Sequence, residues 1–390
     1  MTTPLSLSHI SAGFVAVLVG YTSSAVIIFQ AAAAAGADVA QISSWLWALG
    51  IGMGLTSMGL SFFYKTPILT AWSTPGAALL VTGLSGVSIN EAIGIFIACS
   101  GLITLCGVTG LFQKIMLHVP KSLASAMLAG VLLQFGMNTF VALSSQLLMV
   151  GAMLVTFLTA KYLLPRYVIP LVLMVGVAIA YAQGELPLQQ LSWELSSPIW
   201  ITPEFHLASL IGVGIPLFIV TMTSQNIPGI AVLRANGYST PVSPLISWTG
   251  LTGVILAPFG GFAFNLAAIT AAICMGKEAG EAADKRYLAS MCAGFFYLLT
   301  GIFGATVAAL FAAFPTELVM AVAGLALLGT IGNSLAVAVA EESHREAALL
   351  TFIVTASGVS ILGIGSAFWG IVIGLVAYHL SRRLQVARPR

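Results

Sequence analysis

Apolar stretches of about 20 residues follow one another along almost the whole chain, separated by short polar connections. A straight helix needs about 20 apolar residues to cross the hydrocarbon core of a bilayer. A window of that length predicts about fourteen membrane segments, in two groups of seven on either side of a longer polar connection. The segments are expected near 10–32, 40–63, 66–86, 91–112, 121–138, 142–160, 166–182, 206–233, 242–257, 260–276, 286–313, 316–339, 346–363 and 366–382.

Composition agrees with a polytopic membrane protein and excludes several other classes. Of the 390 residues, 59% are hydrophobic and 7% are charged, whereas soluble domains carry about 25% charged residues. The chain has no basic patch with interleaved aromatic residues, so we expect no nucleic-acid partner. It has no HExxH, no GxSxG and no paired acids in mid-segment, which argues against an enzyme. The four cysteines lie inside apolar segments without metal or disulfide spacing, so we expect no metal site and no cofactor.

Charged residues in the connections predict the orientation. Lys and Arg collect in cytoplasmic loops. With an even number of crossings both termini lie on one side, and every Lys and Arg then falls on that side, which we place in the cytoplasm. The charged residues expected on the opposite side are all carboxylates: Asp38, Glu91, Glu185, Glu194, Glu204 and Glu317.

An odd number of crossings in each half indicates an inverted repeat. The second half would lie upside down relative to the first, as in many secondary transporters. We therefore predict a first repeat at 1–182, an extracytoplasmic linker at 183–205 and a second repeat at 206–390. A weak echo supports this division, since the polar stretch Tyr21–Ser24 of the first segment corresponds to Met222–Gln225 of the eighth.

Two segments at matching positions of the two halves are interrupted by Gly, Pro and polar residues. The third contains TAWSTPGAALL at 70–80, and the tenth contains APFGGFAFNLAAITAAI at 257–273. Irregular backbone at membrane depth is tolerated only where it is buried in protein or lines a cavity. We therefore expect each segment to be an extended stretch followed by a half-helix that begins near the bilayer midplane.

Alignment of the two expected helix starts places Ser73–Gly76 opposite Phe264–Ala267. Thr74 and Asn265 are favoured N-cap residues, and Pro75 is favoured at the first helical position. A helix N-terminus presents unpaired N–H groups and about half a positive charge. Two such ends facing each other predict an anion site without Lys or Arg, with Gly76 leaving room for the ligand. For either segment alone, a proline kink or a packing notch is the alternative.

Polar residues in the middle of the first and eighth segments are costly in a membrane unless they face a ligand or water. A hydrogen-bonded seam between helices is the alternative interpretation. No Asp, Glu, Lys or Arg lies at the expected midplane of any segment. The predicted substrate-binding residues are Tyr21, Thr22, Ser23, Ser24, Trp72, Ser73, Thr74, Pro75, Gly76, Ser224, Gln225, Asn226, Phe264, Asn265, Leu266 and Ala267.

Four stretches resemble the BenE family of bacterial benzoate/proton symporters: GFVAVLVGYTSSAVIIFQAA, ILTAWSTPGAALL, TSQNIPGIAVLRANGY and FGGFAFNLAAITAAICMG. The resemblance spans the full chain and implies import of benzoate with a proton across the bacterial inner membrane. It also implies the seven-plus-seven architecture of uracil and anion transporters, with short strands of segments 3 and 10 crossing at the substrate site, and a homodimer. By this resemblance a core domain (10–112 and 206–313) would move against a gate domain (121–182 and 316–382) in an elevator-type mechanism. The fold expected is thus an all-α polytopic membrane protein in which segments 3 and 10 are each a short strand plus a half-helix.

The nucleobase relatives of this architecture carry a glutamate in the eighth segment, where this chain has Gln225, and the tenth has Asn265 rather than an acid. The loss of fixed negative charge suits an anionic substrate. A carrier or channel for another small anion or a nucleobase on the same scaffold remains the alternative. The proton would be carried by the substrate's own carboxylate or by a residue nearer the membrane face.

Overall fold

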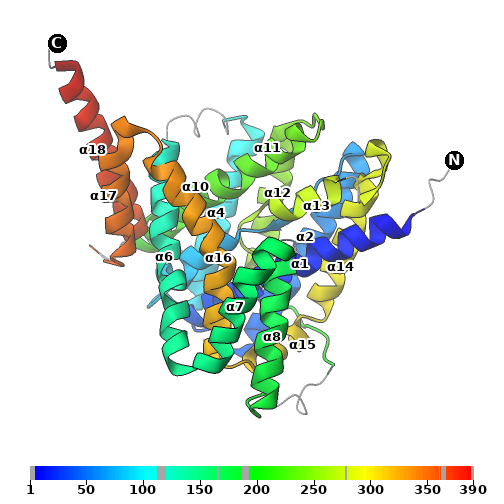
Figure 1. Cartoon of the computed structure of the whole chain (residues 1–390). Helices are drawn as coiled ribbons and strands as arrows, with labels where there is room; N and C mark the ends of the chain where they lie inside the picture. Colours follow the sequence, from blue (N-terminus) through cyan, green and yellow to red (C-terminus); the bar gives the residue numbers. More distant parts are fainter. Residues whose placement is uncertain are drawn as a thin grey trace.

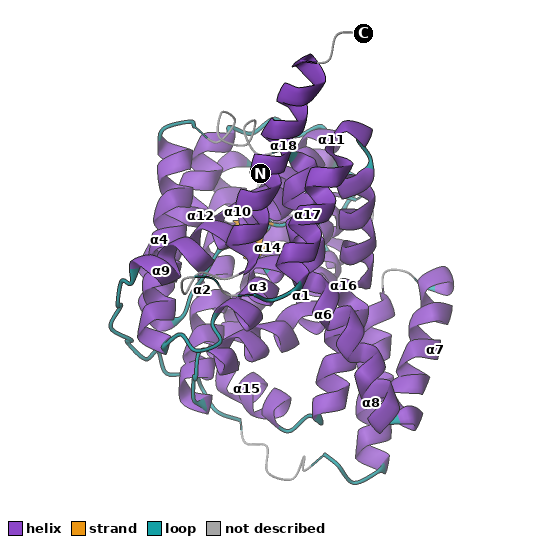
Figure 2. Cartoon of the chain, turned by 90° about the vertical axis from the view of Figure 1, so that its left-hand side faces the viewer, coloured by secondary structure: helices purple, strands orange, loops and turns teal. Residues whose placement is uncertain are grey.

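The computed structural model describes residues 5–111, 120–164, 167–186, 193–276, 279–359, 361 and 366–387. It is mostly helical (Figures 1 and 2). In chain order the elements are α1 (Leu7–Ala34), α2 (Val39–Tyr64), β1 (Thr70–Trp72), α3 (Thr74–Gly83), α4 (Ile89–Val108), α6 (Lys121–Ser145), α7 (Leu147–Leu163), α8 (Val168–Ala182), α9 (Leu207–Ser209), α10 (Ile215–Thr221), α11 (Ile227–Ala235), α12 (Val242–Leu256), β2 (Phe264–Leu266), α13 (Ile269–Met275), α14 (Tyr287–Ile302), α15 (Gly304–Ala312), α16 (Thr316–Val339), α17 (Arg345–Ala356) and α18 (Ser366–Ala387). Two π-helical turns, Leu210–Gly214 and Met222–Asn226, join α9, α10 and α11 into one continuous helix.

Within the described residues, six helices are long and apolar enough to cross a membrane, or up to eight if two bent pairs each count as one span. The bent pairs are the two parts of α1 and the α14–α15 pair, whose axes differ by 69°. Every predicted segment overlaps a helix, although α6 continues to Ser145, beyond its predicted end at 138. The total of about fourteen crossings stays a prediction.

Side-chain caps set the beginnings of several helices. Ser6, Asp38 and Ser88 each accept a hydrogen bond from the backbone N–H three residues later, at the starts of α1, α2 and α4. Such caps satisfy donors that the helix itself leaves unpaired. These positions agree with the polar residues that separate the apolar stretches in the sequence.

Helices far apart in the sequence pack in pairs. The most extensive packing joins α6 to α16, α2 to α14, α4 to α12, and α17 to α18. Figure 1 shows α6, α16, α17 and α18 on one side of the molecule and α2, α13 and α14 on the other. The two strands lie among these helices, where most of their residues are buried.

The two interrupted segments meet as an antiparallel pair of strands. Thr70 of β1 lies opposite Leu266 of β2, and Trp72 lies opposite Phe264. The turn that leads into β2 depends on Gly260, which has a left-handed φ of 94°. A Cβ atom at Gly260 would overlap the ring of the buried Trp45, so only glycine fits this turn.

Candidate functional site

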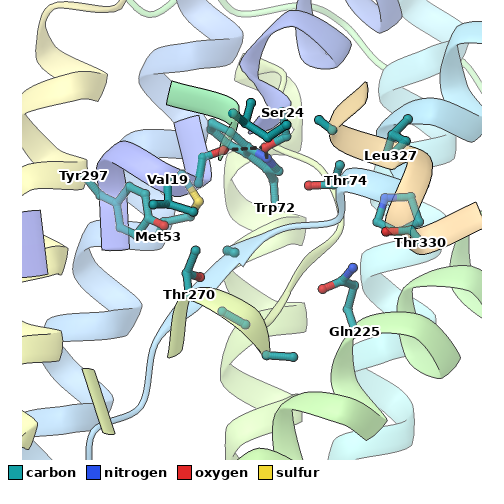
Figure 3. A pocket seen from close by; sticks show the side chains of 17 residues that line it. Val19, Ser24, Met53, Trp72, Thr74, Gln225, Thr270, Tyr297, Leu327 and Thr330 are labelled. Carbon is teal, nitrogen blue, oxygen red and sulfur yellow. Dashed lines mark hydrogen bonds between the residues drawn. The ribbon is translucent and has the colours of Figure 1, made fainter. Parts of the chain in front are cut away.

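A cavity of about 250 Å³ lies beside the pair of strands (Figure 3). Its walls come from α1, α2, the β1–α3 segment, the π-helical turn Met222–Asn226, the β2–α13 segment and α14, and on the other side from α8 and α16. The cavity therefore lies where helices of both halves of the chain converge.

Hydroxyl groups of α2 hold β1 in place. The Thr70 hydroxyl hydrogen-bonds those of Thr56 (2.6 Å) and Ser57 (2.9 Å), and Ser57 Oγ accepts from the Thr70 N–H (3.0 Å). One turn away, Ser61 Oγ accepts from the Ile68 N–H (3.1 Å) and donates to the Ile68 carbonyl (2.7 Å). Ser57 and Ser61 are four residues apart and share one face of α2. The hydroxyl groups of Ser57 and Ser61 thus bond to backbone groups of Thr70 and Ile68 in the way that a second neighbouring strand would.

A single side-chain amide performs the corresponding task for β2. Asn226 Oδ1, fully buried, accepts from the Leu266 N–H (2.9 Å). Gly229, one turn later, packs directly on the strand, because a Cβ atom there would lie 2.7 Å from Leu266 Cβ. Asn226 was expected to contact substrate, but in the structure its carbonyl oxygen positions β2.

The helix start of α3 is one residue earlier than predicted. Ser73, not Thr74, is the N-cap, and its Oγ accepts from the Gly76 N–H (3.0 Å). Thr74 is thus the first helical residue and Pro75 the second. Serine is at least as good a cap as threonine, and this choice leaves both the Thr74 hydroxyl and its N–H at the open end of the helix.

The start of α13 differs more strongly from the prediction. Asn265 is the middle residue of β2, and α13 begins at Ile269 with Ala268 at its N-cap and no side-chain cap. The strand pairing causes this shift, because the Ala267 N–H also bonds to the Leu69 carbonyl (2.9 Å) and keeps the chain extended. Asn265 Nδ2 donates to the Ala263 carbonyl (3.0 Å) instead of capping a helix. The prediction of Asn265 as an N-cap is wrong.

Gly76 does not provide room for a ligand. A Cβ atom at this position would lie 2.7 Å from Ser73 Oγ and 2.8 Å from Leu217 Cδ1. The missing side chain makes room for the serine cap and for the packing of α10 against α3. The cavity wall here is formed by Thr74 and Pro75.

Two aromatic side chains, Trp72 and Tyr297, line the cavity, and Tyr21 packs behind them. Trp72 Nε1 donates to Ser24 Oγ (2.8 Å), and Ser24 Oγ in turn donates to the Gly20 carbonyl (2.7 Å), which fixes the indole ring. Tyr21 packs edge-on against Trp72, with 4.8 Å between the ring centroids. Tyr297 of α14 lies 6.2 Å from Tyr21 and lines the cavity beside Met53.

The cavity has polar groups but no charge. Of the described residues that line it, none is Asp, Glu, Lys or Arg. The side chains of Thr74, Gln225, Thr270 and Thr330 supply hydroxyl and amide groups along the wall (Figure 3), whereas the Ser24 hydroxyl donates to the Gly20 carbonyl. Such a lining can bind an anion through hydrogen-bond donors without a fixed opposing charge.

The predicted site residues divide into those that line this cavity and those that support it. Ser24, Trp72, Thr74, Pro75, Gln225 and Ala267 line it. Those outside the lining are Tyr21, Ser73, Gly76, Ser224, Asn226, Phe264, Asn265 and Leu266. The Ser224 hydroxyl bonds back to the Val220 carbonyl, and the Phe264 ring packs against Gly52 of α2, where a Cβ atom would overlap it. The side chains of Thr22 and Ser23 lie outside what the structure describes.

Several lining residues were not predicted from the sequence. They include Val19, Gly20, Met53, Ile169, Ala268, Thr270, Tyr297, Ala326, Leu327 and Thr330. Thr330 and Tyr297 are polar or polar-tipped residues in the middle of predicted segments, which is a usable signal. The apolar ones carry no such signal, because their place depends only on how distant helices pack.

Solved structures of two membrane proteins resemble this fold at low sequence identity. The chain resembles the transmembrane domain of the cyanobacterial bicarbonate transporter BicA, with a TM-score of 0.57 and 12% identity over 96% of both chains. It also resembles the murine Solute Carrier 26 family member A9 anion transporter in the inward-facing state, with a TM-score of 0.60 and 13% identity over all of this chain and 70% of the other. At these sequence identities the likeness shows a shared, mostly helical membrane-type fold.

Sequence comparison identifies the family. A family model described as benzoate membrane transport protein, BenE, matches residues 3–380. The inner membrane protein YdcO of Escherichia coli K12 is 52% identical over 367 residues, covering 94% of each chain. The benzoate membrane transport protein of Acinetobacter baylyi is 42% identical over 375 residues, covering 96% of this chain and 95% of the other. The chain belongs to the BenE family of benzoate membrane transport proteins.

Proposed function

We propose that this protein imports benzoate or a similar aromatic carboxylate together with a proton, and that the cavity beside β1 and β2 is its substrate site. The observation that carries the proposal is the composition of this cavity. One small uncharged space combines a helix N-terminus, several hydroxyl groups and a wall of aromatic rings. A carboxylate and an aromatic ring are the two chemical groups that such a space accommodates.

The carboxylate would bind at the open end of α3. The Gly76 N–H is used by the Ser73 cap, and Pro75 has no N–H, so Thr74 supplies the available donors of the first turn through its N–H and hydroxyl. The helix dipole adds about half a positive charge at this end. Hydrogen bonds to a charged group contribute about 1.5–3 kcal/mol each. Gln225, which also lines the cavity, can add an amide N–H.

The ring would lie against Trp72 and Tyr297. Both side chains line the cavity, and Trp72 is held in one orientation by Ser24. Aromatic rings pair edge-to-face or offset with centroids about 4.5–7 Å apart. The small residues Ala267 and Ala268 on the opposite strand segment leave the width that a ring needs.

Movement of one group of helices against another would carry the site across the membrane. The cavity wall contains Ile169 of α8 and Ala326, Leu327 and Thr330 of α16, which belong to the proposed gate domain (121–182 and 316–382). Its other lining residues belong to the proposed core domain (10–112 and 206–313). The packing of α2 on α14 and of α4 on α12 within the core, and of α6 on α16 within the gate, supports this division. The proposed inverted repeat relates the α2–α14 pair to the α12–α4 pair, and within the gate it relates α6 to α16.

Proton coupling needs a group that titrates, and the lining residues contain no carboxylate or basic side chain. We propose that the substrate's own carboxyl group carries the proton or that a residue nearer the membrane face does so. In either case transport would be driven inward by an acidic exterior.

The test is uptake of radiolabelled benzoate into proteoliposomes with and without an inward proton gradient. We expect saturable uptake that the gradient stimulates and that unlabelled aromatic acids inhibit, whereas bicarbonate and uracil do not. Gln225→Glu should weaken benzoate binding by at least about 10-fold, since a carboxylate at this wall repels the substrate. Gln134→Glu, on an exposed position of α6 outside this cavity, is the control and should bind normally.

Three results would contradict the proposal in different ways. Uptake inhibited by bicarbonate or uracil but not by aromatic acids would indicate another substrate on the same scaffold. Non-saturating currents far above carrier turnover would indicate a channel. Normal benzoate affinity in Gln225→Glu would remove this cavity as the substrate site while leaving the transport activity intact.

A further inference from the structure

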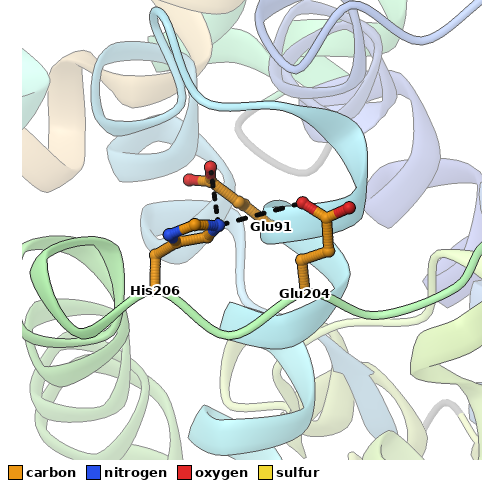
Figure 4. Close-up of side chains that lie close together, drawn as sticks. All are labelled: Glu91, Glu204 and His206. Atoms are coloured by element: carbon orange, nitrogen blue, oxygen red, sulfur yellow. Dashed lines mark ion pairs between the residues drawn. The ribbon is translucent and has the colours of Figure 1, made fainter.

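A second cluster of polar side chains lies where the linker before α9 crosses the first turn of α4 (Figure 4). His206 Nε2 lies 3.5 Å from Glu91 Oε1 and 3.8 Å from Glu204 Oε2. One ligand atom from each of the three residues lies within 4.8 Å of the other two. The cluster brings Glu91 to Glu204 and His206, which lie far from it in the sequence, so local spacing did not predict the three together.

The backbone around this cluster is fixed by several contacts. The Glu204 N–H donates to the Asn90 carbonyl (3.0 Å), and Asn90 Nδ2 donates to the Thr202 carbonyl (2.8 Å). A Cβ atom at Gly94 would overlap the Glu204 carbonyl oxygen, so the linker packs directly on α4. The backbone that carries Glu91 and Glu204 is therefore held in place by packing and hydrogen bonds.

The Glu91 carboxylate is also oriented by its surroundings. Ser209 Oγ donates to Glu91 Oε2 (2.9 Å), which leaves Oε1 directed at His206. In protein metal sites, hydrogen bonds from neighbouring side chains commonly orient ligand carboxylates in this way. Glu91 is partly buried, whereas Glu204 and His206 are exposed and accessible to ions from solution.

The charges in the cluster do not balance. Two carboxylates face a single imidazole, and within the described ranges no Lys or Arg forms an ion pair with Glu91 or Glu204. The distances of 3.5 and 3.8 Å are longer than the 2.7–2.9 Å typical of charged hydrogen bonds. They are close to the separation of about 3.3–3.4 Å between neighbouring ligands of a tetrahedral zinc ion with bonds of about 2.0–2.1 Å.

We propose that Glu91, Glu204 and His206 bind a divalent transition-metal ion on the face of the protein where the linker meets α4. One imidazole nitrogen and two carboxylate oxygens are a ligand set that favours Zn²⁺ over Ca²⁺ and Mg²⁺, which prefer oxygen ligands alone. A fourth position stays open to water. The ion would tie the beginning of the eighth segment to α4 and neutralise the excess negative charge.

The test is isothermal titration of the purified, chelator-treated full-length protein with Zn²⁺. We expect one saturable site per chain that Ca²⁺ at the same concentration does not occupy. His206→Ala and Glu204→Gln should each weaken Zn²⁺ binding at least about 10-fold, because even the loss of a residue that only orients a ligand costs about 10–100-fold in metal affinity. His379→Ala removes another exposed histidine that is outside the cluster and should leave Zn²⁺ binding unchanged.

The absence of saturable Zn²⁺ binding by the native protein would overturn the proposal. Equal affinity in His206→Ala and the native protein, or an equal loss in His379→Ala, would do the same. Each variant is compared by gel filtration and thermal unfolding without metal. Should His206→Ala fail to fold, the near-isosteric Glu204→Gln decides the outcome by itself.

Discussion

The β1–α3 and β2–α13 segments have the same order of elements but are stabilised by different chemistry. β1 and the residue Ile68 before it are held by three hydroxyl groups of α2, and α3 has ten residues and a serine cap. β2 is held by the amide of Asn226, and α13 has seven residues and no side-chain cap. The two segments are therefore not equivalent halves of the site.

From this difference we expect the α3 side and the α13 side of the cavity to have different roles in binding. The α3 side presents hydrogen-bond donors at a capped helix end, where a carboxylate gains most. The α13 side presents Ala267 and Ala268, whose small side chains leave space, together with the single hydroxyl of Thr270. In the proposed substrate site, one side would thus bind the charged group and the other would determine the width available to the ring.

The largest effect on benzoate affinity is expected from a bulkier side chain on the α13 side of the cavity. Ala267→Leu adds three carbon atoms to a residue that lines the cavity. Overpacking of this kind costs about 1–3 kcal/mol, so benzoate affinity should fall by up to about 100-fold. Binding is measured by titration calorimetry on the purified protein. Ala33→Leu, at an exposed position of α1, should bind normally, and unchanged affinity in Ala267→Leu would show that the substrate lies elsewhere.

Removal of a hydroxyl from each side should separate their roles. Thr74→Val deletes a donor at the α3 end and should weaken benzoate binding by about 10-fold, as for a hydrogen bond to a charged group. Thr270→Val deletes a hydroxyl on the α13 side and should weaken it by about threefold, as for a neutral hydrogen bond. Competition binding with labelled benzoate gives both values. A larger loss in Thr270→Val than in Thr74→Val would reverse the assignment of the carboxylate.

The smallest effects concern stability. Asn226→Ala leaves the Leu266 N–H without its partner in a buried position, which should lower the free energy of unfolding by about 2 kcal/mol. Ser73→Ala removes the α3 cap and should cost about 1 kcal/mol. Thermal unfolding in detergent orders the two variants. If Ser73→Ala is less stable than Asn226→Ala, the hydrogen bond from Leu266 to the Asn226 side chain contributes less to the stability of β2 than its burial predicts.

Several residues that line the cavity could be singled out from the sequence because polar residues are rare in this chain. Ser24, Trp72, Thr74 and Gln225 stand out in apolar segments, and each lines the cavity. The prediction of the helix start in the tenth segment failed, because helix capping and strand pairing are both possible for the same residue. Asn265 is a good helix cap by type, but strand pairing with Ala71 placed it in β2.

The sequence alone determined the membrane class, the approximate helix positions and the two interrupted segments, because hydrophobic length and Gly/Pro placement act locally. The family resemblance also came from local stretches, and the family model covering residues 3–380 confirmed it. Only the tertiary structure decided which polar residues face the cavity and which, such as Asn226, support a strand. It alone brought Glu91 beside His206. Such choices depend on contacts between distant helices, and those contacts leave no local pattern in the chain.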